Sequence, residues 1–483
     1  MRQLKNAALL SLLLCFYGHT YSQNLREFPF YTTAGADQRE VEIDRIKVSF
    51  DAHFSVPARY DKERKKIYLN QKAEMLEQLN ETVREKSVFD DVLAPFVQKV
   101  HQQIVKADPS LKDTRVILTA EPVPNAYSVG DGTIVVFTGL LSELENEDQL
   151  AFILCHELAH YQLRHAPVQM EKRIDFLQSK AFKEQVKKVE TAQYNQADLY
   201  EKLVMNTTFQ SRYHHRDLER QADSLAFVVF LKTPYSAQQA VRVMQLFEKM
   251  DQPVTDSTMQ LSHHFGCTDY PFNPQWIAKE EASIWGGAAE KTIEKRKSLA
   301  DSLSTHPDSP KRRAWLEEMM RQSQPPHRDA LASNYGDIQL LSALENVQAW
   351  YDVERYDETI YWALIYGKIY PNMRYFKNML GLAMHGLWEK ARAHHLSDVL
   401  EQPSPYNDAP YNELLKFLNQ LRIREMLELQ SCFAQENEQD EYGLMCAYLY
   451  QKAKENTEKV NQLKQKYLKS YPKGRFSDLL QSN

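Results

Sequence analysis

One short stretch constrains the fold of this chain more than any other: CHELAHYQLRHAP, Cys155 to Pro167. It places His156 and His160 four residues apart, with Glu157 beside the first of them. Because an α-helix turns once per 3.6 residues, side chains at i and i+4 lie one above the other on the same face. On a helix these two imidazoles can therefore bind one metal ion. A five-residue pattern also arises by chance, so a metal site needs support from the rest of the chain.

The length and composition favour two mostly helical domains. The 483 residues are too many for one ordinary hydrophobic core. Hydrophobic residues make up 43% of the chain, which is ample for globular folding, and only 14 residues are glycine. The long stretches rich in Leu, Glu, Lys and Gln point to helices. The 59 basic and 65 acidic residues nearly balance, so the charge gives no reason to expect a nucleic-acid partner.

The N-terminus has the pattern of a signal peptide, expected at 1–22. Two basic residues precede an apolar run at 7–16, and Thr20 and Ser22 stand at positions −3 and −1 of the cleavage site. A lipoprotein anchored through Cys15 is disfavoured, because a large residue precedes it where a small one is expected. No later segment approaches 18 apolar residues, so no transmembrane segment is expected. We expect an exported protein, periplasmic if the host has two membranes, and either free or peripheral to the outer membrane.

The order of the elements predicts an α+β first domain at 23–333 and an all-α second domain at 334–483. Short strands are expected at Arg115 to Thr119 and at Thr133 to Thr138, the second after a Gly-Asp-Gly turn. The helix that carries the histidine pair is expected to open at Asn146, with acidic residues in its first turn. The first domain is therefore mostly helical with a small sheet.

The second domain has the pattern of helical pairs. The segment Glu354 to Asn372 resembles the second helix of a tetratricopeptide (TPR) unit that ends at Pro371, and Pro405 follows after one period of about 34 residues. Leu380-Gly381 and Trp388 also resemble positions of the TPR signature. The alternative is chance, since a chain with 20 prolines places some of them at any period. We expect degenerate TPR-like repeats.

A catalytic zinc ion needs a third protein ligand, which the histidine pair does not supply. The metzincin solution is excluded, because Ala166 stands where a third histidine is required. Two Glu-x-x-x-Asp stretches remain. Glu171 and Asp175 lie in a highly charged segment with no buried face, whereas Glu219 and Asp223 precede the apolar SLAFVVF. An acidic side chain at the start of a buried helix is unfavourable there unless a cation or another partner compensates its charge.

We therefore expect Glu219 to be the third ligand. Asp223, one turn later, can accept the other ring N–H of a ligand histidine. The alternative for this pair is an ordinary helix start stabilised by salt bridges. A purely structural zinc site is disfavoured, because such sites are usually closed by Cys and His.

Four motifs in the same order resemble one family. HELAH followed by ERQAD, Glu219 to Asp223, is similar to the HEXXH/EXXXD gluzincins, the family of HtpX heat-shock endopeptidases and CAAX-prenyl proteases. Asn125 to Leu141 resembles the family's segment before the motif helix, and Ser304 to Arg312 resembles its His-Pro…Arg element. The resemblance covers roughly 60–320. With the export signal and the TPR-like tail, the architecture is similar to the BepA-like periplasmic proteases. Gln221 departs from the family, which often has a glutamate there, and is expected to be tolerated.

The resemblance implies a zincin-like metallopeptidase and assigns roles by position. It implies one zinc ion bound by His156, His160 and Glu219, the general base Glu157, and the supporting carboxylate Asp223. His306 would fill the open zinc position and hold the enzyme latent; the alternative is a loop histidine that caps the next helix. Arg312 would either stabilise the oxyanion or anchor this loop through a carboxylate. His165, five residues after His160, is expected to point away from the ligand face.

The strand Thr133 to Thr138 is expected to be a sheet edge that pairs with an extended substrate, with Asn125, Thr133 and Val135 as contact residues. The alternative is an internal strand of a small sheet. Among the cysteines, Cys432 could pair with Cys446 across neighbouring helices in an oxidising compartment.

Two functions compete. The first is an exported zinc endopeptidase that hydrolyses misfolded or stalled envelope proteins and uses its TPR-like repeats to dock clients or the envelope assembly machinery. The second is a chaperone or adaptor in outer-membrane protein assembly with a latent zinc site. A substitution of Glu157 distinguishes the two functions, because only the enzyme needs this general base.

Overall fold

The computed structural model describes residues 36–191, 216–250, 252, 254, 259–277, 309–331, 334–404, 407–434 and 440–482. They divide into two compact units, which we call the N-terminal and the C-terminal unit. The described residues of 36–252 and 309–343 make the N-terminal unit, and those of 254–277 and 344–482 make the C-terminal unit. The expected signal peptide lies outside the described residues. The expected continuous division at 334 stays a prediction, and the segment 254–277 groups with the C-terminal helices instead.

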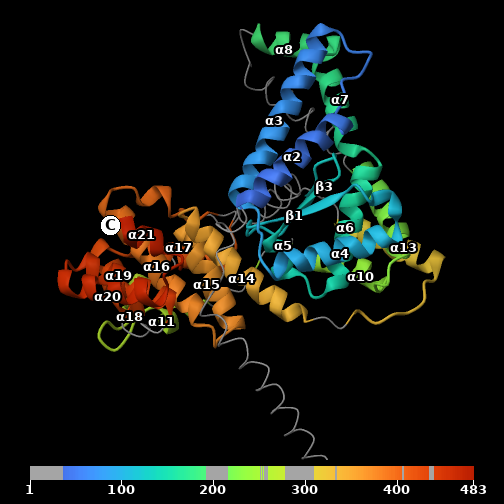
Figure 1. Cartoon of the computed structure of the whole chain (residues 1–483). Helices are drawn as coiled ribbons and strands as arrows, with labels where there is room; N and C mark the ends of the chain where they lie inside the picture. The colour runs from blue at the N-terminus through green and yellow to red at the C-terminus, as the bar shows by residue number, and fades with distance from the viewer. Residues whose placement is uncertain are drawn as a thin grey trace, which may run out of the picture. The chain divides into compact units, whose positions relative to one another are not determined.

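The N-terminal unit is mostly helical with one three-stranded sheet, which confirms the predicted fold class (Figure 1). Its helices are α2 (Ala36–His53), α3 (Lys62–Lys86), α4 (Leu93–Ala107), α5 (Thr138–Glu143), α6 (Glu147–Gln162), α7 (His165–Leu177), α8 (Lys180–Glu190), an unlabelled helix at 216–230, α10 (Gln238–Met250) and α13 (Ser309–Ser323). Its strands are β1 (Arg115–Thr119), β2 (Ala126–Ser128) and β3 (Thr133–Phe137). Among the described residues, no helix is both long and apolar enough to cross a membrane.

The sheet has the strand order β1-β3-β2, so β3 is its central strand. β1 runs parallel to β3, and β2 pairs antiparallel with it, with Tyr127 opposite Val135. The prediction that Thr133 and Val135 form a substrate-binding edge is therefore wrong, because both sides of β3 already pair with neighbouring strands. The run TIVVF is buried at four of its five positions, as a central strand requires. The edge next to the motif helix is β2, which directly follows Asn125.

Helix α6 lies at the centre of the N-terminal unit and packs against β2, β3, α4 and α10. It opens at the N-cap Asn146, whose side chain accepts a hydrogen bond from the backbone N–H of Gln149, as predicted. Asp148 in its first turn accepts backbone N–H groups of Ser236 and Leu331. Residues 147–159 are all buried. The helix that carries the histidine pair is thus buried over most of its length and held in place at its N-terminus.

The tight turn between β2 and β3 requires glycine. Gly130 has φ 99°, and a Cβ there would lie 2.7 Å from Cβ of Ala166 at the start of α7. We expect Gly130→Ala to lower the free energy of unfolding by about 1–3 kcal/mol through strain and overlap. The matched control is Gly336→Ala in α14 (Tyr335–Asp352), where nothing lies within 4 Å of an added Cβ. Urea unfolding of both variants tests this, and equal stabilities would contradict it.

His101 on α4 makes the stability of this unit depend on pH. Its side chain is 5% exposed, and its Nε2 lies 2.8 Å from Oγ1 of Thr114. Burial lowers the pKa of His101 from 6.5 to about 4. The imidazole of His101 is therefore protonated below about pH 6.5 in the unfolded chain, but only below about pH 4 in the folded chain.

We expect this difference to remove up to about 3 kcal/mol of stability as the pH falls from 6.5 to 4. His101→Gln should make the loss of stability at low pH smaller, whereas His263→Gln, at an exposed position, should leave this loss unchanged. Urea unfolding at pH 7 and pH 4.5 measures the difference. A His101→Gln profile that parallels the wild type would contradict the prediction.

The C-terminal unit is built from helices around α16. Its helices are α11 (Leu261–His264), the second half of α14, α15 (Tyr356–Ile369), α16 (Arg374–Arg392), α17 (Ala409–Gln420), α18 (Ile423–Ala434), α19 (Glu441–Ala453), α20 (Thr457–Ser470) and α21 (Ser477–Ser482). α16 packs against α15, α18 and α19. At Gly381 a Cβ would lie 2.5 Å from Sγ of Cys446 and 2.7 Å from Cβ of Phe433, so the absence of a side chain lets three helices meet closely. Their assignment as TPR repeats stays a prediction.

A disulfide joins Cys267 to Cys432 within the C-terminal unit, with Cα atoms 5.5 Å apart. The suggested pairing of Cys432 with Cys446 is wrong. Cys446 is a buried free thiol beside Gly381. Because any two cysteines that the fold brings together can pair, spacing along the chain does not determine the partner.

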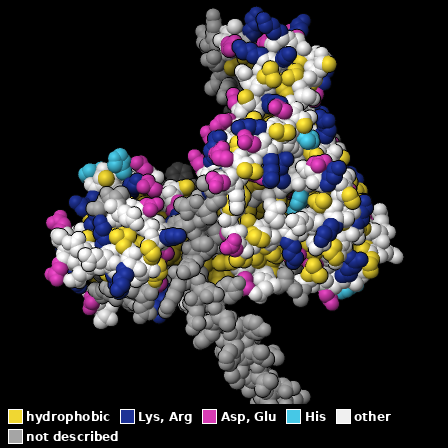
Figure 2. All heavy atoms as spheres, viewed as in Figure 1, with side chains coloured by type: hydrophobic (Ala, Val, Ile, Leu, Met, Phe, Trp, Pro, Cys, Tyr) yellow, Lys and Arg dark blue, Asp and Glu magenta, His cyan; other side chains and the backbone are white. Residues whose placement is uncertain are grey.

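Basic side chains gather at the end of the N-terminal unit formed by α3, α7 and α8, at the top of Figure 2. Helix α8 contributes four lysines to this surface, Lys180, Lys183, Lys187 and Lys188. α8 buries none of its residues, so this surface is a solvated face. It lies apart from the buried residues of α6 that make the site.

A candidate metal centre

Two elements far apart in sequence bring three metal-ligating side chains together. His156 and His160 project from α6, and Glu219 projects from the helix 216–230. One donor atom from each lies within 4.8 Å of the others. The Nε2 atoms of the two histidines are 3.1 Å apart, and each lies 3.4 Å from a carboxylate oxygen of Glu219. The structure thus brings together the three residues that the sequence singled out.

The chemistry of these donors fits a zinc ion. Two imidazole nitrogens and one carboxylate oxygen are the ligand set of many catalytic zinc sites, which leave a fourth position open. His156 and Glu219 are each only 3% exposed. Side chains of this kind are seldom fully buried unless a partner or a cation compensates them. A single divalent cation would be held by three ligands from two packed helices.

Asp223 holds His156 from behind. Its Oδ1 lies 2.9 Å from Nδ1 of His156, on the far side of the ring from Nε2, and its side chain is completely buried. Burial alone would raise the pKa of Asp223, but the charge and hydrogen bonds of Arg312 and His156 hold it well below its usual range. Asp223 is therefore ionised and fixes the ring so that Nε2 faces the other two donors.

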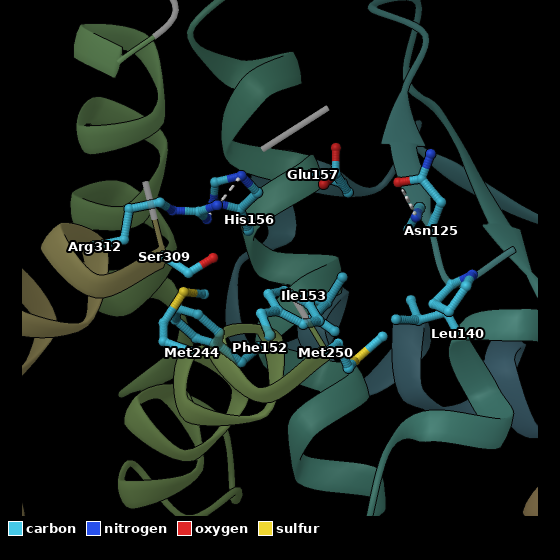
Figure 3. Close-up of a pocket in the computed structure, with 13 residues that line it drawn as sticks. Asn125, Leu140, Phe152, Ile153, His156, Glu157, Met244, Met250, Ser309 and Arg312 are labelled. Atoms are coloured by element: carbon cyan, nitrogen blue, oxygen red, sulfur yellow. Dashed lines mark hydrogen bonds between the residues drawn. The ribbon is translucent and has the colours of Figure 1, made fainter. Parts of the chain in front are cut away.

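Arg312 on α13 closes the cluster. Its Nε and Nη2 both donate to the carboxylate of Asp223 at 2.8 Å, and its Nη1 lies 3.2 Å from Oε2 of Glu219. Figure 3 shows its guanidinium reaching His156. These contacts tie the start of α13 to the site through two carboxylates, whereas the loop that Arg312 was predicted to anchor lies before Ser309, outside the described residues. A role of Arg312 in stabilising an oxyanion stays a prediction.

The cluster favours protonation of His156 when no cation is present. Burial and the charge of Arg312 oppose a proton there, but hydrogen bonds to Asp223 and Glu219 outweigh them and raise the pKa of His156 to about 9. A metal ion needs the neutral imidazole, so binding of a cation near neutral pH has to release this proton.

His165 lies against the other ligand histidine, contrary to the prediction that it points away. α6 ends at Gln162, and Arg164 adopts a left-handed conformation with φ 55° before α7 begins at His165. This break turns the His165 ring back, so that its Nδ1 lies 2.9 Å from Nδ1 of His160. Burial lowers the pKa of His165 below its ordinary value. The prediction was wrong because it continued the helix through residue 164.

A pocket opens beside the cluster on the side of Glu157. Figure 3 shows Glu157 between His156 and Asn125, the residue before the edge strand β2. Apolar side chains from α6 and α10 line one wall of the pocket, namely Phe152, Ile153, Met244, Phe247 and Met250. The residues of α10 were not among those predicted for the site. The pocket thus combines an acidic group with an apolar wall.

The competing carboxylates do not contribute to the cluster. Glu171 and Asp175 on α7 accept hydrogen bonds from Arg59 at 2.8 and 3.0 Å. Gln221 is exposed on the helix 216–230, between Glu219 and Asp223, and leaves both buried carboxylates in place.

The remaining histidines do not join the cluster within the described part of the chain. His263 and His264 are exposed on α11 in the C-terminal unit. His306, the proposed fourth ligand, lies outside the described residues, as do His214 and His215.

Comparisons with known proteins agree with this site. Residues 95–320 match the model of Peptidase family M48. The mitochondrial metalloendopeptidase OMA1 of Arabidopsis thaliana is 25% identical over 172 residues, which cover 35% of this chain and 33% of that protein. OMA1 of Schizosaccharomyces pombe is 44% identical over 46 residues, 10% of this chain and 14% of that protein. The alignments thus span a third or less of these relatives, and most of the C-terminal unit lies outside the family match. Residues 95–320 of this chain form a domain of Peptidase family M48, a family of zinc metallopeptidases.

Proposed function

We propose that the chain is a zinc-dependent endopeptidase that hydrolyses peptide bonds of misfolded or stalled envelope proteins. One observation carries the proposal: the donor atoms of His156, His160 and Glu219 converge at a pocket that also holds Glu157. A zinc ion held by these donors supplies Lewis-acid chemistry, because it acidifies water and polarises a carbonyl oxygen.

The side chains around the cluster have separate tasks in this reaction. Glu157 accepts a proton from the attacking water and returns it to the leaving amine. Asp223 keeps His156 in the orientation that presents Nε2. The open edge of β2, starting at Ala126, pairs with the extended backbone of the substrate. The apolar wall of α10 accepts a substrate side chain next to the bond that breaks.

The envelope location rests on two supports. The N-terminal sequence has the pattern of an export signal, and the disulfide between Cys267 and Cys432 is typical of proteins in oxidising compartments. In this proposal the C-terminal helical unit docks clients or the envelope assembly machinery. The second candidate is a chaperone or adaptor whose zinc site is latent, and it is favoured by the size of this helical unit.

Removal of the metal distinguishes the two candidates. The full-length mature protein should cleave an unfolded substrate such as casein, and a zinc chelator should lower the rate at least about tenfold, because the residual site lacks its Lewis acid. Added zinc should restore the rate. Cleavage that is unchanged in chelator would contradict a zinc enzyme, and binding of casein without any cleavage would favour the adaptor.

A further inference from the structure

We propose that His165 is a positioning residue for the metal: it accepts the Nδ1–H of His160 and so fixes this imidazole as a ligand. The inference rests on the proposed zinc site and deepens it. His165 itself is not among the residues whose donor atoms converge in the cluster.

The geometry assigns a direction to the hydrogen bond between the two rings. Their Nδ1 atoms are 2.9 Å apart, and the rings meet edge to face at 79°. Two ring nitrogens at this distance need one proton between them, so one ring donates and the other accepts. Nε2 of His160 is the atom that faces His156 and Glu219. A metal bound there leaves the proton on Nδ1 of His160, which therefore donates, and His165 accepts.

The backbone is shaped to make this contact. On an uninterrupted helix, a residue five positions after His160 lies well off the ligand face. Arg164 instead takes a left-handed conformation, which is unfavourable for a residue with a Cβ atom. The break starts a new helix at His165 and turns its ring, which is only 6% exposed, back towards His160.

The two ligand histidines are thus supported by partners of different charge. His156 is held by the ionised Asp223, and His160 by a neutral imidazole. Two carboxylates, Glu219 and Asp223, already lie in the cluster and would offset the two charges of a bound zinc ion, while Arg312 forms ion pairs with both. A further carboxylate behind His160 would have to be buried there at a cost in desolvation. A neutral acceptor orients the ring and adds no charge.

Two amide substitutions test whether Nδ1 of His165 is the atom that accepts the hydrogen bond. In His165→Asn the side-chain oxygen can take the place of Nδ1, whereas in His165→Gln it reaches towards the place of Nε2. Zinc affinity is measured on the full-length protein by competition with a coloured chelator at fixed pH. We expect His165→Gln to bind zinc about 10–100-fold more weakly, the loss found for partners of this kind, and His165→Asn to stay within a few-fold of the wild type.

Two further measurements separate positioning from a structural role. Thermal unfolding in chelator should be nearly the same for both variants, and the visible spectrum of the cobalt-loaded protein should change in His165→Gln and not in His165→Asn. His263→Gln serves as the control at an exposed position. Equal zinc affinity of the two amide variants would overturn the inference while leaving the zinc site intact. A wild-type protein that binds no zinc would overturn the proposed function instead.

Discussion

Replacing Glu157 with glutamine is expected to lower the rate of peptide-bond hydrolysis by about a thousandfold, within the range that general acid–base catalysis contributes. Glutamine keeps the shape of the side chain but cannot accept a proton from water. Because Glu157 is not one of the three converging ligands, zinc affinity should stay within a few-fold of the wild type. Casein cleavage under saturating zinc and chelator competition measure the two quantities.

The control is Glu184→Gln on α8, where the carboxylate is largely exposed and distant in sequence from the site. It should leave both quantities unchanged. If Glu157→Gln cleaves as fast as the wild type, the proposed general base is wrong. If cleavage by Glu157→Gln is lost but this variant still replaces the wild-type protein in cells, the adaptor accounts for the biological role better than the enzyme does.

Arg312→Met is expected to destabilise the folded protein in chelator by about 3–5 kcal/mol, the typical result of breaking a buried ion pair from one side. The guanidinium lies between the carboxylates of Asp223 and Glu219, which are 0% and 3% exposed. Methionine fills a similar volume but removes the guanidinium, and it leaves the imidazole of His156 as a cationic partner for these two carboxylates. Urea unfolding in chelator measures the loss.

The matched control is Arg321→Met on the same helix, whose ion pair with Glu318 is largely exposed. It should cost at most about 1 kcal/mol. Added zinc should reduce the loss in Arg312→Met, because the cation compensates part of the same negative charge. A loss no larger than that of Arg321→Met would contradict the view that Arg312 holds the cluster together.

The sequence predicted which three donor side chains converge, because each of them has a local signal. His156 and His160 follow from the helical period, and the opening of their helix at Asn146 follows from a capping residue and acidic neighbours. Glu219 follows from its place at the start of an apolar segment, where a carboxylate needs a buried partner. The mostly helical fold with a small sheet follows from composition and periodicity.

The features that the sequence did not predict depend on contacts between distant segments. The central place of β3 is set by which strands pair, and a β-branched run is compatible with an edge or a centre. The position of His165 depends on the left-handed Arg164, where no glycine marks the break. The partner of Cys432 depends on how the segment around Cys267 packs onto α18, which spacing does not encode.

Anomalous diffraction at the zinc absorption edge, on crystals of the metal-loaded protein, tests the ligand assignment most directly. A single strong peak should lie within about 2.0–2.2 Å of Nε2 of His156, Nε2 of His160 and a carboxylate oxygen of Glu219. A zinc peak bound elsewhere, with Glu219 turned away from the two imidazoles, would contradict the account.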